Sequence, residues 1–412
     1  MRLEELCDVT SSKRIYAKEL VPSGVPFLKS KEIIEKVNGQ GHSNLLFISE
    51  ERFQQIIEQT GAPEAGDVLL TSRGTLGVPY VVRATDRFHF ADGNLTWFRN
   101  FHNLDSRFLS YFFLSPSGRA ELAKCVIGSS QAAYTIAALK KIEIALPPLP
   151  MQRSIASMLS AYDDLIENNT RRIAILEEMA WRVYEEWFVS FRCPSASPST
   201  ENGALPRGWR KMALSDLVQT QYGYTASASD DPVGPHFLRG MDINKRTHID
   251  WTTVPYCPIT PKDHEKFQLR VGDVLMIRMA DPGKVALVEK DVDAVFASYL
   301  VRFTIRDDVV SPLFLFYTLS ARRYQDFISG ASTGTTRKSA SAKLMTSPEI
   351  VVPPREVVSE FDGVVRPMRN LVNRLVEINA NLRQQRDLLL PRLVSGKQRV
   401  RQASANREEA TA

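Results

Sequence analysis

Several features are scarce or missing in this 412-residue sequence, and each absence excludes a class of protein. No apolar run approaches the roughly 20 residues that a membrane-spanning helix needs. The 4 cysteines stand far apart without a Cys-x-x-Cys pair, which argues against a disulfide framework or a zinc site. Glu4 and Glu5 lie where a signal peptide would be apolar. We therefore expect a soluble protein of the reducing cytoplasm.

Signatures of catalysis are also missing. The sequence has no Walker A loop, no His-Glu-x-x-His motif, and no lysine with an acid two residues before it, as in a common nuclease site. Its 6 histidines include no pair at the i, i+4 spacing of a helical metal site. These absences predict a protein that is not an enzyme, with no catalytic residue, metal or cofactor of its own.

The sequence does contain an internal repeat. Gly66-Asp67-Val68-Leu69-Leu70 recurs 206 residues later as Gly272-Asp273-Val274-Leu275-Met276. The same offset relates Phe108 to Phe314 and the pair Pro147-Pro148 to Pro353-Pro354. A colinear series at one offset indicates a tandem duplication rather than chance similarity.

Each repeat contains a mixed module followed by a long helix, so the predicted fold class is α+β. Short runs rich in β-branched and aromatic residues predict strands, and apolar residues in alternating steps of four and three predict a coiled-coil seam in each helix. We expect the two helices to pair as an antiparallel coiled coil, with one buried Asn in each seam to fix the register. Alternatively, each helix covers only its own module. The predicted pairing residues are Ile155, Leu159, Tyr162, Ile166, Asn169, Ile173 and Leu176, with Phe361, Val365, Met368, Val372, Leu375, Asn379 and Leu382.

Composition along the chain predicts the boundaries. A linker rich in Ser and Pro separates the halves, the tail is polar and expected to be disordered, and Pro391 is expected to break or bend the second helix. The predicted segments are a first recognition module at 1–149, the first helix at 150–192, the linker at 193–207, a second module at 208–352, the second helix at 353–396 and the tail at 397–412.

Loops at corresponding places in both halves carry cationic and hydrogen-bonding side chains. Arg can bond guanine through two N–H groups, Gln can bond adenine, and hydroxyl groups fit phosphates. A net charge of +5 means that any basic surface must arise from how the fold segregates charges. The candidate DNA-binding residues are Lys29, Ser30, Arg73, Thr75, Ser129, Gln131, Tyr222, Tyr224, Arg239, Arg278, Lys284, Thr335, Arg337 and Lys338.

Two segments resemble a known family. Leu146-Pro147-Pro148-Leu149-Pro150-Met151-Gln152-Arg153, at the start of the first helix, resembles the conserved-region entry of type I restriction-modification specificity (S) subunits. The segment 388–397, Leu-Leu-Leu-Pro-Arg-Leu-Val-Ser-Gly-Lys, is similar to the end of that family's second helix. The second copy departs from this pattern. After its Pro-Pro pair it has Arg355-Glu356 and lacks the Gln-Arg pair that is usual in the family and present here as Gln152-Arg153.

The resemblance implies a non-catalytic subunit with two target-recognition domains, each of which recognises one half of a bipartite, asymmetric site in double-stranded DNA. The helices would set the spacer and dock two methyltransferase (M) subunits, while restriction (R) subunits complete the complex. S-adenosylmethionine, ATP and magnesium would then belong to the partner subunits. Two alternatives remain open: a duplicated protein-interaction scaffold with a coiled-coil rod, and an enzyme whose motif is not recognised.

Overall fold

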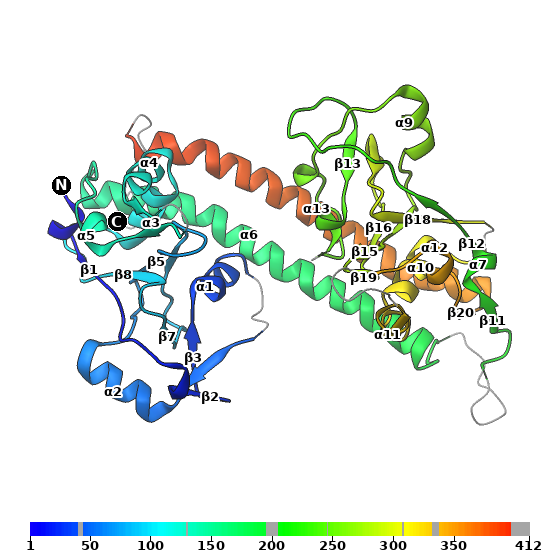
Figure 1. Cartoon of the computed structure of the whole chain (residues 1–412), viewed down its shortest axis with the longest axis horizontal. Coiled ribbons are helices and arrows are strands. Elements are labelled where there is room, and N and C mark those ends of the chain that lie inside the picture. The colour runs from blue at the N-terminus through cyan, green and yellow to red at the C-terminus, as the bar shows by residue number, and fades with distance from the viewer. Residues whose placement is uncertain are drawn as a thin grey trace, which may run out of the picture. The chain divides into compact units, whose positions relative to one another are not determined.

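The computed structural model describes residues 1–39, 44–128, 131–194, 205–244, 246–306, 309–331 and 338–396. The chain divides into two compact units: unit 1 comprises Met1–Asn168 and Asn381–Ala412, and unit 2 comprises Asn169–Ala380. Figure 1 shows the elements of both units in chain order. The predicted tail and positions 195–204 of the predicted linker lie outside the described residues.

The main sheet of unit 1 is buried on both faces. Val68 and Leu70 of β5 join one core cluster, whereas Leu69 between them joins another. Because successive strand residues point to opposite faces, this wholly apolar run needs a packed layer on each side. The sheet is antiparallel, in the order β1-β8-β5-β6, with strands β1 (Asp8–Thr10), β5 (Val68–Thr71), β6 (Pro79–Val81) and β8 (Leu95–Arg99).

Helices cover one face of this sheet, and a second sheet completes unit 1. The side chain of Ser115 caps α4 by accepting from the Gly118 N–H at 3.1 Å. A Cβ at Gly118 would lie 1.8 Å from the Phe112 carbonyl oxygen, so only glycine permits this approach of α4 to α3. The second sheet has the order β2-β4-β3-β7. The remaining elements of unit 1 are 3-10 turns at Leu3–Glu5 and Ala17–Glu19, β2 (Leu20–Val21), β3 (Val25–Leu28), α1 (Ser30–Val37), β4 (Leu46–Ile48), α2 (Glu50–Thr60), β7 (His89–Phe90), α3 (Ser106–Leu114), α4 (Pro116–Lys124), β9 (Val126–Ile127), β10 (Ala133–Tyr134) and α5 (Ile136–Lys140).

Unit 2 repeats this design. Val274 and Met276 of β14 join one core cluster, and Leu275 and Ile277 join another. The antiparallel sheet has the equivalent order β12-β18-β14-β16. Its elements are β11 (Arg210–Ala213), α7 (Leu214–Leu217), β12 (Val218–Tyr222), β13 (His236–Leu238), α8 (Gly240–Ile243), a 3-10 turn (Trp251–Thr253), α9 (Pro261–Phe267), β14 (Val274–Ile277), β15 (Met279–Ala280), β16 (Val285–Leu287), β17 (Ala294–Phe296), β18 (Leu300–Ile305), α10 (Pro312–Ser320), α11 (Arg322–Ala331), β19 (Lys338–Ser339), α12 (Ala342–Met345) and β20 (Glu349–Val352).

Backbone hydrogen bonds repeat between the units at the offset seen in the sequence. The Gly66 N–H donates to the Val82 carbonyl at 2.9 Å, and the Gly272 N–H donates to the Val288 carbonyl at 2.8 Å. Both glycines have a positive φ, 97° and 98°. That conformation explains the Gly before the Asp in both copies of the motif, because residues with a Cβ adopt it rarely. The two modules therefore share one backbone framework.

Two long helices extend into both units. Helix α6 (Leu149–Tyr184) continues into a π-helical turn (Glu185–Val189), and α13 comprises Arg355–Val394. Helix α13 continues through Pro391 to Val394, so the predicted break is wrong, while the predicted bend at Pro391 stays a prediction. Pro391 lacks the N–H for the bond to the carbonyl four residues earlier, but Leu390 and Leu393 beside it are buried in the core of unit 1 and hold the helix in place.

The helices pack side by side and antiparallel, as the sequence predicts. In unit 1, Leu393 of α13 lies in the same core cluster as Leu159 of α6. In unit 2, Ile173 packs in one cluster with Val372 and Leu375, and Asn169 Nδ2 donates to Asn379 Oδ1 at 2.9 Å. As residue numbers increase along α6, the residues of α13 that they contact have decreasing numbers, so the two helices run antiparallel. Five of the predicted pairing residues are only half-buried: Tyr162, Ile166, Leu176, Met368 and Leu382. No helix in the described part of the chain is long and apolar enough to cross a membrane.

Candidate nucleic-acid interface

Five predicted side chains of unit 1 lie on neighbouring loops, and we call them loop surface 1. All are exposed except Ser30, which is half-buried. Among the described residues, Arg73 has neither an ion pair nor a side-chain hydrogen bond, so its charge is available. Loop surface 1 comprises Lys29, Ser30, Arg73, Thr75 and Gln131.

Hydrogen bonds hold these loops together. The Asn94 carbonyl accepts from Ser30 Oγ at 3.1 Å and from the Ser72 N–H at 2.7 Å. The Ser72 carbonyl accepts from the Tyr134 N–H at 3.1 Å, and Arg73 forms a β-bridge with Ala133. The start of α1, the β5–β6 loop and the β9–β10 hairpin are therefore fixed against one another.

The β5–β6 loop has its own internal brace. Thr71 is fully buried, and its Oγ1 accepts from the Val78 N–H at 2.9 Å while its carbonyl accepts from the Gly77 N–H at 2.9 Å. Gly74 and Gly77 have φ of 75° and 78°, which glycine adopts without strain. The loop thus presents Arg73 and Thr75 from a closed turn.

The equivalent loops of unit 2 form loop surface 2, which comprises Tyr222, Arg278, Lys284, Tyr299 and Lys338. The Arg278 N–H donates to the Tyr299 carbonyl at 2.9 Å, and the Arg278 carbonyl accepts from the Ala340 N–H at 2.9 Å. Lys338 pairs with Ala280 across the two short strands β15 and β19. These bonds reproduce the pattern around Ser72 in unit 1.

Tyr299 is a residue that sequence reasoning missed. Its side chain is 48% exposed, beside Arg278 in the backbone network. The repeat offers a signal for it, because the offset that aligns Phe98 with Phe303 places Tyr299 at the position of Asn94. A comparison of the two halves at every loop position could therefore have found it.

Two other predicted residues of unit 2 are engaged within the fold. Arg239 makes two side-chain hydrogen bonds to Asp242, at 3.1 and 3.0 Å, and caps α8 with it. Tyr224 packs 5.4 Å from the Phe267 ring, ring centre to ring centre. Contact of either residue with DNA stays a prediction, as does that of Ser129, Thr335 and Arg337, which lie outside the described residues.

The backbone register corrects one equivalence that the loops suggest. Arg73 and Arg278 both follow the Gly-Asp strand, but Arg278 occupies the position of Ser72, while Arg73 corresponds to Met279. The two units therefore present different side chains from the same backbone position.

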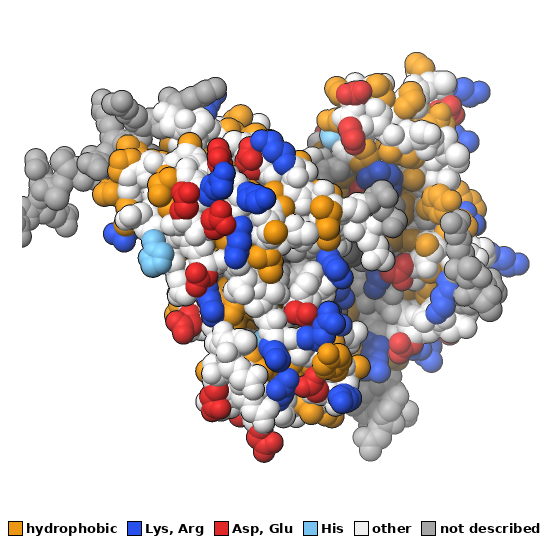
Figure 2. Space-filling model, turned by 60° about the vertical axis from the view of Figure 1, so that its left-hand side comes forward, with side chains coloured by type: hydrophobic (Ala, Val, Ile, Leu, Met, Phe, Trp, Pro, Cys, Tyr) orange, Lys and Arg blue, Asp and Glu red, His pale blue; other side chains and the backbone are white. Residues whose placement is uncertain are grey.

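Charge is mixed on the surface. Figure 2 shows Lys and Arg side chains interspersed with Asp and Glu over the face that it presents. This agrees with the net charge of only +5. Recognition of a polyanion on this face would depend on individually placed cations rather than on a uniformly basic field.

A polar junction joins the recognition module of unit 2 to α13. Arg369 is only 1% exposed, and its Nε and Nη2 donate to the Glu289 carboxylate at 3.0 and 2.5 Å. Burial alone would lower the pKa of Arg369, but the hydrogen bonds and charge of Glu289 outweigh it and raise that pKa. Lys290 forms an ion pair with Glu377 beside it.

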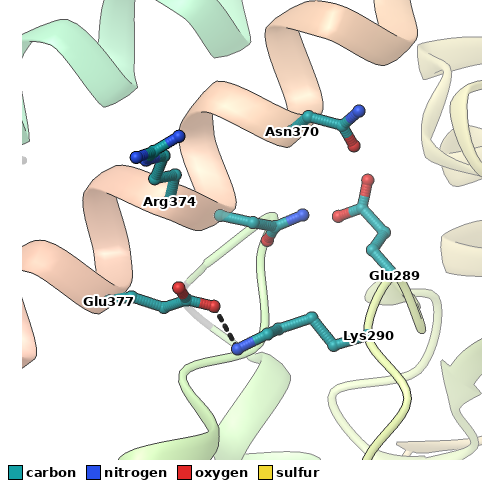
Figure 3. Close-up of a pocket in the computed structure, with 6 residues that line it drawn as sticks. Glu289, Lys290, Asn370, Arg374 and Glu377 are labelled. Carbon is teal, nitrogen blue, oxygen red and sulfur yellow. Dashed lines mark ion pairs between the residues drawn. The ribbon is translucent and has the colours of Figure 1, made fainter.

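An open cavity of about 490 Å³ lies at this junction. Figure 3 shows the Lys290–Glu377 pair across it, with Arg374 turned away from Glu289. Its lining is polar, and the paired charges hold the β16 loop to the helix. The described residues contain no group of three or more His, Cys, Asp or Glu side chains that could hold a metal ion.

Comparisons with known proteins agree with this architecture. Residues 1–178 match the family model described as the type I restriction modification DNA specificity domain. The MjaIX specificity subunit of Methanocaldococcus jannaschii is 26% identical over 81% of this chain and 78% of its own length. The HindI specificity subunit of Haemophilus influenzae is 24% identical over 64% of this chain and 70% of its own length.

A solved structure has the same fold. The S subunit of a type I restriction-modification system from M. genitalium superposes with a TM-score of 0.59 at 14% identity, covering 95% of each chain. The predicted α+β class, with two modules and two paired helices, is confirmed. The chain is thus related, over most of its length, to the specificity subunits of type I restriction-modification enzymes.

Proposed function

We propose that this chain is the non-catalytic DNA sequence-specificity subunit of a type I restriction-modification complex. One observation carries the proposal: two units present different side chains from the same hydrogen-bonded loop framework. Different side chains on one backbone suit recognition of two different sequences. Each unit therefore recognises one half of a bipartite, asymmetric site in double-stranded DNA.

In this proposal the paired helices set the spacer between the half-sites. Helix α6 alone has 36 residues, which corresponds to about 54 Å at 1.5 Å per residue. One turn of B-DNA is about 34–36 Å long. Insertion of four residues in one helix is expected to change the spacer or abolish binding, because it rotates and shifts every later seam position. An unchanged spacer with intact binding would contradict this role.

The helices also dock two methyltransferase subunits. Exposed apolar side chains recur seven residues apart outside the seam, at Met158 and Leu165 of α6 and at Val364 and Leu371 of α13. Each pair occupies the equivalent place in its repeat, which suits two copies of one partner. Restriction subunits complete the complex in the cytoplasm, and S-adenosylmethionine, ATP and magnesium belong to the partner subunits.

Genome-wide mapping of adenine methylation tests the proposal, with the full chain coexpressed with its neighbouring methyltransferase subunit. We expect one bipartite motif with a fixed gap. Arg73→Ala should alter one half of the motif, and Arg278→Ala the other half. Arg322→Ala is the matched control, because Arg322 has a 93% exposed side chain and only a 3.6 Å surface pair with Asp326.

Random or absent methylation, with both subunits folded and associated, would contradict the proposal. It would favour the protein-interaction scaffold instead.

A further inference from the structure

We propose that Arg278 recognises a guanine base in the half-site of unit 2 and that Tyr222 is its positioning residue. The proposal rests on the DNA-specificity function above and names the base and the side chains that carry it. Four observations support it: the fixed backbone of Arg278, its stacking on Tyr222, the absence of a carboxylate partner among the residues that the structure describes, and the different residue at this position in unit 1.

The first two observations concern geometry. Hydrogen bonds to Tyr299 and from Ala340 fix the main chain of Arg278 on both sides. Its guanidinium carbon lies 4.7 Å from the centre of the Tyr222 ring, within the range of a cation–π contact. Tyr222 is fixed in turn, because its hydroxyl accepts from the Ala342 N–H at 3.0 Å. The side chain of Arg278 is thus oriented before any ligand arrives.

The third observation is that no acid in the described part of the chain forms an ion pair with Arg278. Arg302 of β18 pairs with Asp273 at 3.2 Å, and Arg239 pairs with Asp242 at 3.0 Å. Among the described residues, Arg278 has no ion pair, and its guanidinium lies over the Tyr222 ring instead. A guanidinium without an acidic partner keeps its fork of N–H donors for a ligand.

Guanine fits these donors best. In the major groove it presents two adjacent acceptors, O6 and N7, which match the planar fork of a guanidinium. The stacking face of Tyr222 restricts the plane of that fork, so less side-chain entropy is lost when the two bonds form. Lysine has the same charge but no fork, so the geometry separates base recognition from simple attraction.

The fourth observation is the residue at the same backbone position in unit 1. Ser72 is 2% exposed, and its Oγ is engaged with the Leu70 carbonyl at 3.1 Å and Thr96 Oγ1 at 2.7 Å. Unit 1 therefore has no guanine-recognising side chain at this point. The effect of Arg278 should be confined to one half-site.

The test uses the full chain in complex with its methyltransferase subunit. Equilibrium binding is measured by fluorescence anisotropy on duplexes in which each base pair of the wild-type site is replaced in turn. The wild type should discriminate for one G·C pair by roughly 5- to 150-fold through Arg278. Arg278→Ala and Arg278→Lys should both lose this discrimination at that pair alone.

Tyr222 variants separate positioning from a general structural role. Tyr222→Ala should weaken discrimination at the same base pair. Tyr222→Phe should keep most of the wild-type discrimination, because the ring under Arg278 is retained. Arg322→Ala should bind every duplex as the wild type does. Circular dichroism and thermal melting check that each variant is folded.

Three results would overturn the inference. The first is that folded Arg278→Ala and Arg278→Lys keep wild-type discrimination at every position. The second is a uniform loss of affinity on all duplexes with a smaller salt dependence, which would identify a phosphate contact. The third is a Tyr222→Ala variant that discriminates as the wild type does. If the wild-type complex itself showed no sequence preference, the specificity function would fail, and not this assignment alone.

Discussion

The buried asparagine pair between the long helices allows a double-mutant cycle with a definite sign. Asn169 and Asn379 are 3% and 2% exposed, and their amides are joined by a 2.9 Å hydrogen bond. Asn379 Nδ2 also lies 3.4 Å from Thr170 Oγ1. Substitution of one Asn by Val removes the 2.9 Å bond and leaves the other amide in the buried seam with one hydrogen bond fewer.

Loss of a hydrogen-bond partner from a buried amide costs about 1–3 kcal/mol. For a unit of this size, 1 kcal/mol shifts Tm by about 2–4 °C, so each single variant should melt about 2–12 °C below the wild type. Replacement of both partners removes the unsatisfied groups together. Asn169→Val with Asn379→Val should therefore recover most of the stability or exceed that of the wild type.

Differential scanning calorimetry of the full chain measures these shifts, with Arg322→Ala as an exposed-site control. The coupling should appear as a double variant that is more stable than the two single losses predict. If the stability losses of the two single variants simply add in the double variant, the two asparagines have no interaction energy, which would contradict this reasoning. If the double variant also changes its oligomeric state on size-exclusion chromatography, the Asn pair fixes the partner and register, at a cost in stability.

Three further predictions concern ionisable groups. Arg369→Met breaks the buried pair with Glu289, and unit 2 should lose about 3–5 kcal/mol in urea unfolding; a loss below about 1 kcal/mol would mean that the pair is solvated. Burial alone would raise the pKa of Glu177, but hydrogen bonds from His248 and a neighbouring Thr outweigh it and lower that pKa. Ionised Glu177 therefore stabilises the fold above its ordinary pKa of 4.5, and the contribution is lost as pH falls through the lowered value. The Tm difference between wild type and Glu177→Gln should shrink on acidification, and a constant difference would contradict this. Burial, followed by the charge of Asp8, raises the pKa of Cys7 to about 12, so Ellman's reagent at pH 8 should leave Cys7 unmodified until the protein unfolds.

Repetition made the fold predictable. The Gly-Asp motif marks a backbone position with positive φ in both units, and the seam spacing places Asn169 and Asn379 together. Both features follow from the spacing of residues within one strand or one helix, and that spacing can be seen directly in the sequence. Pro391 misled because a proline disturbs only the turn before it, while Leu390 and Leu393 on either side of it are held in the core of unit 1.

The site was less accessible to sequence reasoning. Arg239 and Arg278 look alike as loop cations, yet one is bound by Asp242 and the other lies over Tyr222. For Arg239 a signal existed, since an acid three residues later commonly completes a helix cap. For Arg278 the sequence offers no such signal, because Tyr222, on which it stacks, lies 56 positions earlier and the contact depends on the loop conformation.

The composition of the two units has a consequence for protein synthesis. Unit 2 is one continuous stretch of chain, Asn169–Ala380, whereas the core of unit 1 includes Leu390 and Leu393 beside Leu159. During synthesis, unit 1 cannot complete its core until the last turns of α13 have been made. All residues of unit 2 are synthesised before the last residues of unit 1, so unit 2 can fold first. Once residue 380 has emerged from the ribosome, unit 2 can fold while the apolar side of early α6 is still exposed to chaperones.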